Sequence, residues 1–111
     1  MDLKEIEQKV IAFRDERNWK QFHHIQDLLL GLNIEVAELQ ELFLWKSETE
    51  QNEISNEKIK DELADIAIFL LYICRHYNID LSEAIINKLA KNDIKYPADK
   101  SRNSNKKYTE L

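Results

Sequence analysis

The sequence contains very few of the residues that usually break up a chain, with one glycine and one proline among 111 residues. Many tight turns depend on one of these two residues, so their scarcity favours long helices joined by short loops. No segment alternates apolar and polar residues as a half-buried strand does, and no dipeptide is typical of a hairpin turn. The sequence therefore predicts an all-α protein with one domain, which at this length buries roughly two thirds of its unfolded surface.

Cysteine and long hydrophobic runs are equally scarce. The single cysteine, Cys74, cannot form an internal disulfide, and within an apolar stretch it is expected to be a buried small side chain and not a reactive thiol. The longest uninterrupted apolar run, 66–74, has nine residues, and a helix needs about 20 to span a membrane. The charged N-terminus does not resemble a signal peptide. We therefore expect a soluble, cytoplasmic protein with no membrane partner.

Positive charge is scarce in most of the chain. Residues 1–87 contain 9 basic and 18 acidic side chains, whereas residues 88–111 contain 7 basic and 3 acidic ones. Nucleic-acid binding requires a basic surface, so the acidic body argues against a nucleic-acid partner. A basic C-terminal segment suits a small polyanion carried by a metal ion, although a solvated polar tail is the alternative explanation for residues 98–111.

Apolar periodicity and capping residues predict four helices, over about 2–17, 28–46, 57–77 and 81–95. Their expected N-terminal signals are Asp27 for the second helix, Ser55 or Asn56 for the third, and the capping box Asp80-Leu-Ser-Glu83 for the fourth, which Pro97 ends. Residues 18–26 are expected to be an irregular connection and 46–56 a polar loop. We assign residues 1–97 to the helical domain and 98–111 to a polar, basic, flexible tail.

Two acidic pairs stand out, Glu35-Val-Ala-Glu38 and Glu62-Leu-Ala-Asp65. The spacing of three residues places both carboxylates of a pair on one face of a helix. Each pair lies in an apolar stretch, where an unpaired buried charge costs several kcal/mol or more. Like charges at such positions require a positive partner, and the simplest one is a divalent cation.

The ligand types indicate which metal and which chemistry to expect. Carboxylate oxygens suit Mg²⁺ or Mn²⁺ better than Zn²⁺, and neither acidic pair ends in the histidine that a di-iron bundle needs. The sequence has no nucleophilic serine or cysteine motif and no glycine-rich phosphate loop. Water activated by a metal is therefore the expected nucleophile.

Helical spacing extends each acidic face toward aromatic side chains. Phe69, Tyr72 and His76 follow the second pair on one stripe, and Leu42 and Trp45 follow the first. A metal site beside an aromatic wall suits a nucleotide, which has a phosphate end and a flat end. Ordinary core or interface packing is the alternative explanation for Trp45 and Tyr72.

The third helix is apolar nearly all round, since Asp65 is the single charged residue in 63–74. A helix of this kind is buried on every side. Four helices cannot easily surround one of their own, so we expect packing against a second copy of the chain. Complete coverage of this helix within one monomer is the alternative.

The acidic signature, Glu-x-x-Glu, 23 residues and Glu-x-x-Asp on helices, resembles that of the all-α nucleoside triphosphate pyrophosphohydrolases. Three more segments are similar to the small MazG-like branch that includes dCTP pyrophosphatase. They are 13–23, which begins Phe-Arg-Asp-Glu-Arg, 38–46, which ends Leu-Trp-Lys, and 88–97, which ends Lys-Tyr-Pro. The resemblance covers about residues 10–97 and joins four separate motifs.

This resemblance implies a MazG-like four-helix bundle, assembled as a homodimer or as a dimer of dimers, a homotetramer. It implies hydrolysis of a (deoxy)nucleoside triphosphate, with a dCTP-like pyrimidine favoured, to the monophosphate and pyrophosphate in nucleotide-pool housekeeping. By the same resemblance Mg²⁺, with Mn²⁺ as a possible substitute, is held by Glu35, Glu38, Glu62 and Asp65, which also orient the attacking water. The base and sugar would contact Trp19, His23, Trp45 and Tyr72, and the triphosphate would contact Lys88, Lys91, Asn92, Lys95 and Tyr96.

Two other functions remain open at this stage. One is a non-catalytic nucleotide-binding or regulatory module on the same fold, which would not need so dense a negative cluster. The other is a helical interaction protein whose acidic pairs are solvated, which the apolar neighbours of Glu62 and Asp65 disfavour. If the protein is an enzyme, Glu38 or Glu35 is our candidate for the general base.

Overall fold

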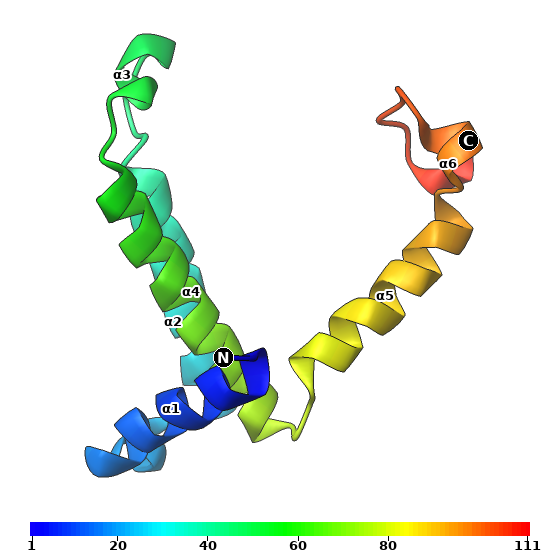
Figure 1. Ribbon diagram of the computed structural model, residues 1–111. Helices are drawn as coiled ribbons and strands as arrows, with labels where there is room; N and C mark the ends of the chain where they lie inside the picture. The colour runs from blue at the N-terminus through cyan, green and yellow to red at the C-terminus, as the bar shows by residue number, and fades with distance from the viewer. The chain divides into compact units, whose positions relative to one another are not determined.

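The protein is entirely helical in a computed structural model that describes residues 1–111 (Figure 1). The chain forms two compact units, residues 1–79 and 80–111. The first unit contains α1 (Leu3–Glu16), the 3₁₀ turn η1 (Trp19–Phe22), α2 (Ile25–Glu41), α3 (Glu48–Asn52) and α4 (Asn56–His76). The second contains α5 (Leu81–Lys95), α6 (Ala98–Ser101) and the 3₁₀ turn η2 (Tyr108–Glu110). The all-α prediction is confirmed, and the four-helix arrangement stays a prediction.

Helices α2 and α4 lie side by side through most of the first unit (Figure 1). The chain's single glycine, Gly31 on α2, faces the ring of Phe69 on α4, and a Cβ atom at Gly31 would overlap that ring. The glycine therefore lets the two helices approach closely, one helical turn before Glu35. Because neighbouring turns of two packed helices stay in register, this contact also brings the acidic pairs opposite each other.

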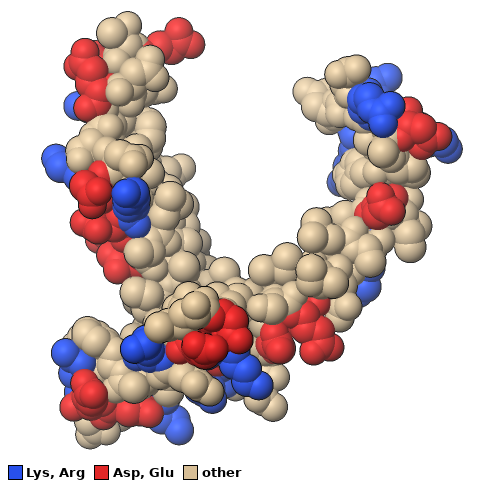
Figure 2. Space-filling model, in the orientation of Figure 1, with Lys and Arg blue, Asp and Glu red and all other residues tan.

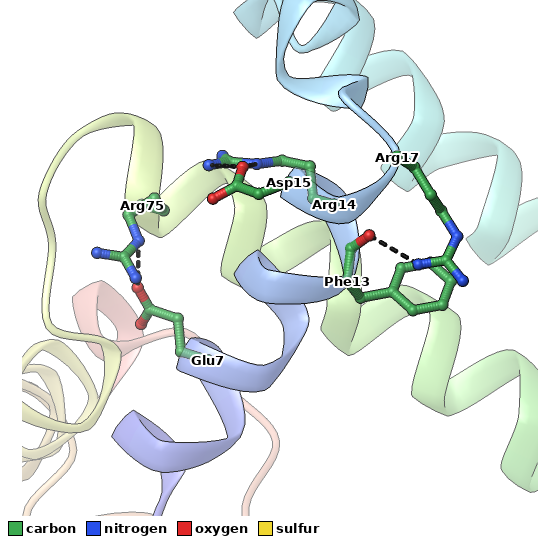
Figure 3. A network of polar contacts seen from close by, with 6 residues as sticks. All are labelled: Glu7, Phe13, Arg14, Asp15, Arg17 and Arg75. Carbon is green, nitrogen blue, oxygen red and sulfur yellow. Dashed lines mark hydrogen bonds and ion pairs between the residues drawn. The ribbon is translucent and has the colours of Figure 1, made fainter.

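The core lies where α1 crosses the α2–α4 pair. Ile11, Leu28 and Tyr72, one from each helix, are 8%, 2% and 6% exposed, and partly buried Val10, Ile68, Phe69 and Ile73 pack around them. An ion pair also joins α1 to α4, with the Glu7 carboxylate 3.4 Å from the Arg75 guanidinium (Figure 3). The core is small for the unit, and it is placed next to the acidic pairs.

The first two helices differ in how well the sequence predicted their bounds. Helix α1 agrees with prediction to within a residue, and the Asp2 side chain accepts a hydrogen bond from the Glu5 amide at 2.8 Å. Helix α2 was predicted from 28 to 46, which is wrong at both ends. It begins at Ile25, so Asp27 lies in its first turn, where a carboxylate favours the helix dipole, and His24 is the N-cap.

Beyond the C-terminal end of α2 the backbone forms tighter turns, in which the amides of Phe43 and Leu44 bond to the carbonyls of Gln40 and Glu41, three residues back. The chain leaves the helix after Glu41, and Trp45 adopts a left-handed backbone with φ 61°.

The polar segment 46–56, predicted as a loop, contains the short helix α3. Its capping box joins Ser47 and Glu50, with each side chain accepting a hydrogen bond from the other residue's amide.

Helix α4 begins after Ser55, as predicted. Although this helix is apolar nearly all round, the first unit buries only part of its surface. Leu71 and Cys74 are buried, whereas Leu63 is 51% and Leu70 is 37% exposed. The first unit therefore does not cover this helix by itself. No helix of the structure combines the length and the hydropathy that crossing a membrane requires.

The second unit begins with the predicted N-cap, since the Asp80 side chain accepts a hydrogen bond from the Glu83 amide at 3.1 Å. Residues 98–111 include α6 and η2, so part of the expected tail is helical. Tyr108 of η2 packs edge-on against Tyr96, with ring centroids 5.9 Å apart, and the Lys95 ammonium lies 5.0 Å from the Tyr108 ring centre. A separate flexible tail after residue 97 stays a prediction.

Candidate active site

Side-by-side packing of α2 and α4 gathers the acidic pairs into one cluster, Glu35, Glu38, Glu62 and Asp65. One carboxylate oxygen each from Glu35, Glu62 and Asp65 lie within 4.8 Å of one another, a spacing that suits one metal ion. Glu38 lies outside this group of three, but it is among the causes that raise the pKa of both Glu35 and Glu62. The two motifs, predicted separately from sequence, thus meet in space.

Burial and like charge make the ionised cluster unfavourable. The pKa of Glu35 is raised to about 7. Burial is the largest cause, followed by a hydrogen bond with Glu38 and the charge of Glu38, and then by the charges of Asp65 and Glu62. The pKa of Glu62 is also raised, by burial first and then by Glu38.

Two oxygens of the cluster, Oε2 of Glu35 and Oε2 of Glu62, are buried without a hydrogen-bond partner. Buried polar atoms normally have a partner, because an unpaired one costs free energy. Carboxylate oxygens are also the ligands that Mg²⁺ and Mn²⁺ prefer. The residues present therefore fit a divalent cation.

An aromatic cavity of about 450 Å³ adjoins the cluster, and Asp65 belongs to the lining of both. Three of the four residues predicted to contact the base, Trp19, His23 and Tyr72, line this cavity. The rings of His23 and Tyr72 contact each other at a tilt of 59°, with centroids 4.5 Å apart. We call this cavity the nucleotide pocket, after the ligand that the sequence predicts for it.

His23 contributes an unpaired polar atom to the wall of the nucleotide pocket. Its Nδ1 is buried without a hydrogen-bond partner, and burial, with the nearby charge of Arg14 as a smaller cause, lowers the pKa of its imidazole. Its neutral form is therefore favoured, and one ring nitrogen of neutral histidine can accept a hydrogen bond. The short turn η1, which follows Asn18 in a left-handed backbone at φ 53°, places Trp19 and His23 on the same pocket.

Sequence patterns gave no ligand contact to Lys9 and Phe13, which also line the pocket, whereas Phe69 was expected on the aromatic stripe that follows the second acidic pair. The ring of Phe13 meets that of Trp19 edge-on at 5.8 Å, and the ring of Phe69 meets that of Tyr72 at 5.9 Å. The signals were present, because Phe69 lies on the same stripe as Asp65 and Lys9 precedes Phe13 by one helical turn. Lys9 is the pocket's basic side chain.

Trp45 is not part of the nucleotide pocket of its own chain. Its predicted position, two helical turns after Glu38 on the same stripe, is wrong because α2 ends at Glu41. The side chain is 91% exposed and lies outside the lining of the pocket. A single chain therefore does not bring Trp45 to Trp19, His23 and Tyr72.

The residues predicted to contact the triphosphate all belong to the second unit, on α5 or at its end. Lys88 and Asn92, four residues apart, line one shallow apolar groove of about 330 Å³. Lys91 is exposed on the same helix, and Lys95 and Tyr96 lie against Tyr108. Their contact with a triphosphate stays a prediction.

Known proteins resemble the chain closely in sequence and in fold. Residues 30–111 match the MazG-like family. The chain is 40% identical to dCTP pyrophosphatase 1 of Mus musculus and also to that of Homo sapiens, over 114 residues that cover 98% of this chain and 67% of each relative. A pyrophosphatase crystal structure from Archaeoglobus fulgidus superimposes with a TM-score of 0.78 at 36% identity, covering 86% of this chain and 92% of that one. The chain therefore belongs to the MazG-like family, in its nucleoside triphosphate pyrophosphohydrolase branch.

Proposed function

We propose that the chain hydrolyses a pyrimidine deoxynucleoside triphosphate between its α- and β-phosphates, with Mg²⁺ as cofactor and Mn²⁺ as a substitute. The products are the monophosphate and pyrophosphate, and the role is housekeeping of the nucleotide pool. The observation that carries the proposal is the acidic cluster, with two unpaired buried oxygens, beside an aromatic pocket that shares Asp65. The preference for dCTP rests on the names of the relatives.

Glu35, Glu62 and Asp65 are the proposed ligands of the cation, because their oxygens already converge. When bound, the cation neutralises phosphate charge and lowers the pKa of a coordinated water. Glu38 lies next to this group without belonging to it, so it is the carboxylate best placed to take the proton from the attacking water. We therefore assign the general base to Glu38 and not to Glu35.

The nucleotide pocket supplies binding of the base and sugar. The exposed face of Trp19 and the ring of Tyr72 offer stacking surfaces, and the imidazole of His23 contributes to the same wall. Because Asp65 belongs to both the pocket lining and the cluster, we infer that the phosphate end of the nucleotide faces the cation held by the cluster. Lys88, Lys91, Asn92, Lys95 and Tyr96 remain our proposed contacts of the triphosphate, supported by the net positive charge of residues 88–111.

Self-association as a homodimer or homotetramer is part of the proposal. Large apolar side chains remain exposed on both packed helices, among them Leu30 at 59% and Ile34 at 50% on α2, and Leu63 at 51% on α4. A surface of this kind usually binds another protein surface. The proposed contact of Trp45 with the base depends on this step, because Trp45 lies outside the pocket of its own chain.

The test is product analysis with Mg²⁺ and dCTP in isotopically labelled water. We expect monophosphate and pyrophosphate, with the labelled oxygen in the monophosphate, and no turnover in the presence of a chelator until Mg²⁺ or Mn²⁺ is added in excess. Glu62→Gln should lose nearly all turnover, whereas Glu57→Gln, an exposed glutamate on the same helix, should keep it. Diphosphate and orthophosphate as products would overturn the proposed bond cleavage, and nucleotide binding without turnover would favour the non-catalytic module.

A further inference from the structure

A second cavity, of about 530 Å³, shares only His23 and Tyr72 with the nucleotide pocket. None of the four acids of the cluster lines it. Its floor is apolar and includes Ile11 and Leu28 from the core.

The lining of the second cavity has the opposite charge to the rest of its unit. Residues 1–79 contain sixteen Asp and Glu side chains and only nine Lys and Arg. Three of those nine, Arg14, Lys20 and Arg75, line the cavity together with His76, against a single acid, Asp15. We call it the cationic cavity.

Ion pairs within the protein leave part of this positive charge without a partner. Arg14 is bound to Asp15 at 2.8 Å, and Arg75 is bound to Glu7 at 3.4 Å (Figure 3). A guanidinium has five N–H donors, so each keeps donors that its carboxylate does not use. Lys20 and His76 have no acidic partner within 4.0 Å. The space-filling view also shows acidic and basic side chains gathered around α1 (Figure 2).

We propose that the cationic cavity binds a small phosphate monoester, separately from the metal cluster. Guanidinium groups match phosphate oxygens with paired hydrogen bonds, and a lysine ammonium adds a compact charge. Arg14 is held in place by burial, with 8% of its side chain exposed, so its donors are already oriented. The apolar floor of Ile11 and Leu28 receives the carbon part of the ligand, and the shared rings of His23 and Tyr72 connect its occupancy to the nucleotide pocket.

The test uses the three histidines as reporters in the metal-free protein. His23 and His76 line the cationic cavity, and His24, which lines neither cavity, is an internal control. In a chelator, the acidic cluster repels anions and does not contribute. Inorganic phosphate and glycerol 3-phosphate are titrated at fixed pH and fixed ionic strength while the imidazole proton resonances are recorded. We expect saturable shifts at His23 and His76 and none at His24, with tighter binding of glycerol 3-phosphate.

Charge variants decide whether the cavity itself is responsible. Lys20→Gln should weaken binding at least fivefold, because it removes an unpaired, exposed cation without breaking an ion pair. Lys4→Gln, on α1 outside the cavity, should bind like the wild type. Arg75→Gln provides a second, independent loss of charge. Shifts that do not saturate, an equal shift of His24, or wild-type affinity in Lys20→Gln would overturn the proposal, and equal affinity for both ligands would identify free phosphate as the ligand of the site.

Discussion

Glu35→Gln should stabilise the metal-free protein above neutral pH. In the wild type, burial and the neighbouring acids raise the pKa of Glu35 from its ordinary value of 4.5 to about 7. Without solvent screening, a pKa change of this size means that the ionised Glu35 carboxyl destabilises the folded state by about 3 kcal/mol. Solvent at this partly exposed side chain screens the effect, which leaves about 1–2 kcal/mol. Glutamine keeps the shape and removes the charge.

The raised pKa also fixes the sign of the pH dependence. Between pH 4.5 and about 7 the folded protein holds a proton on Glu35 that the unfolded chain has lost. The free energy of unfolding of the wild type should therefore fall as pH rises through this window. Glu35→Gln should lose that part of the slope, because it has no carboxyl to titrate.

Thermal melting in a chelator at pH 5 and pH 8 provides the assay. At pH 8 Glu35→Gln should melt about 5–10 °C above the wild type, since 1 kcal/mol corresponds to several degrees in a domain of this size. Millimolar Mg²⁺ should raise the melting temperature of the wild type and have much less effect on the variant. Glu41→Gln, an exposed glutamate on the same helix but outside the cluster, should shift by no more than a few tenths of a kcal/mol. A metal-free Glu35→Gln protein that melts below the wild type at pH 8 would refute mutual repulsion in the cluster.

Two further substitutions test the packing that surrounds the site. Gly31→Ala should destabilise the fold by about 1–3 kcal/mol in urea denaturation, because the new Cβ overlaps the Phe69 ring. Adding Phe69→Leu to that variant should recover part of the loss. A Gly31→Ala protein more stable than the wild type would contradict the close approach of the two helices. Trp45→Ala should change the folding free energy by less than about 0.5 kcal/mol, because the side chain is 91% exposed. It should also raise the nucleotide KM tenfold or more, as loss of a stacked aromatic costs ~1–3 kcal/mol. Monomers with unchanged nucleotide affinity in light scattering would instead make Trp45 an interface residue.

Local sequence patterns predicted the parts of the site that depend on one helix at a time. Spacing of three residues placed Glu35 with Glu38 and Glu62 with Asp65, and any side-by-side packing of their helices brings the pairs together. The family motifs added Trp19 and His23, which spacing alone does not connect to Tyr72. These three residues do share a pocket in the structure. What the sequence lacked was the crossing of α1 over α4, which sets the remaining walls.

The errors arose where a helix end was read from apolar content. Leu42 to Trp45 are apolar and extend the pattern of α2, so the periodicity gave no reason to stop at Glu41. After Glu41 the backbone bonds run to the third residue back, and the chain then reaches a left-handed conformation at Trp45, which a bulky residue rarely adopts. No residue type in this segment signals that change. In contrast, helix α3 had a readable signal in Ser47-Glu-Thr-Glu50, a capping box within a segment whose polarity suggested a loop.

On α2 and α4 the acidic cluster, which destabilises the packing of the two helices, lies next to the apolar contacts that stabilise it. The acidic cluster disfavours close approach of the two helices without a cation, as the raised pKa values of Glu35 and Glu62 show. One turn away, the Gly31–Phe69 contact demands that same close approach, and buried Leu28 lies one turn further along α2. The packing therefore holds the carboxylates together before any cation binds, so little of the metal's binding energy is needed to assemble the site. A substitution that weakens the Gly31–Phe69 contact should therefore lower the affinity for the metal, although neither Gly31 nor Phe69 touches the metal.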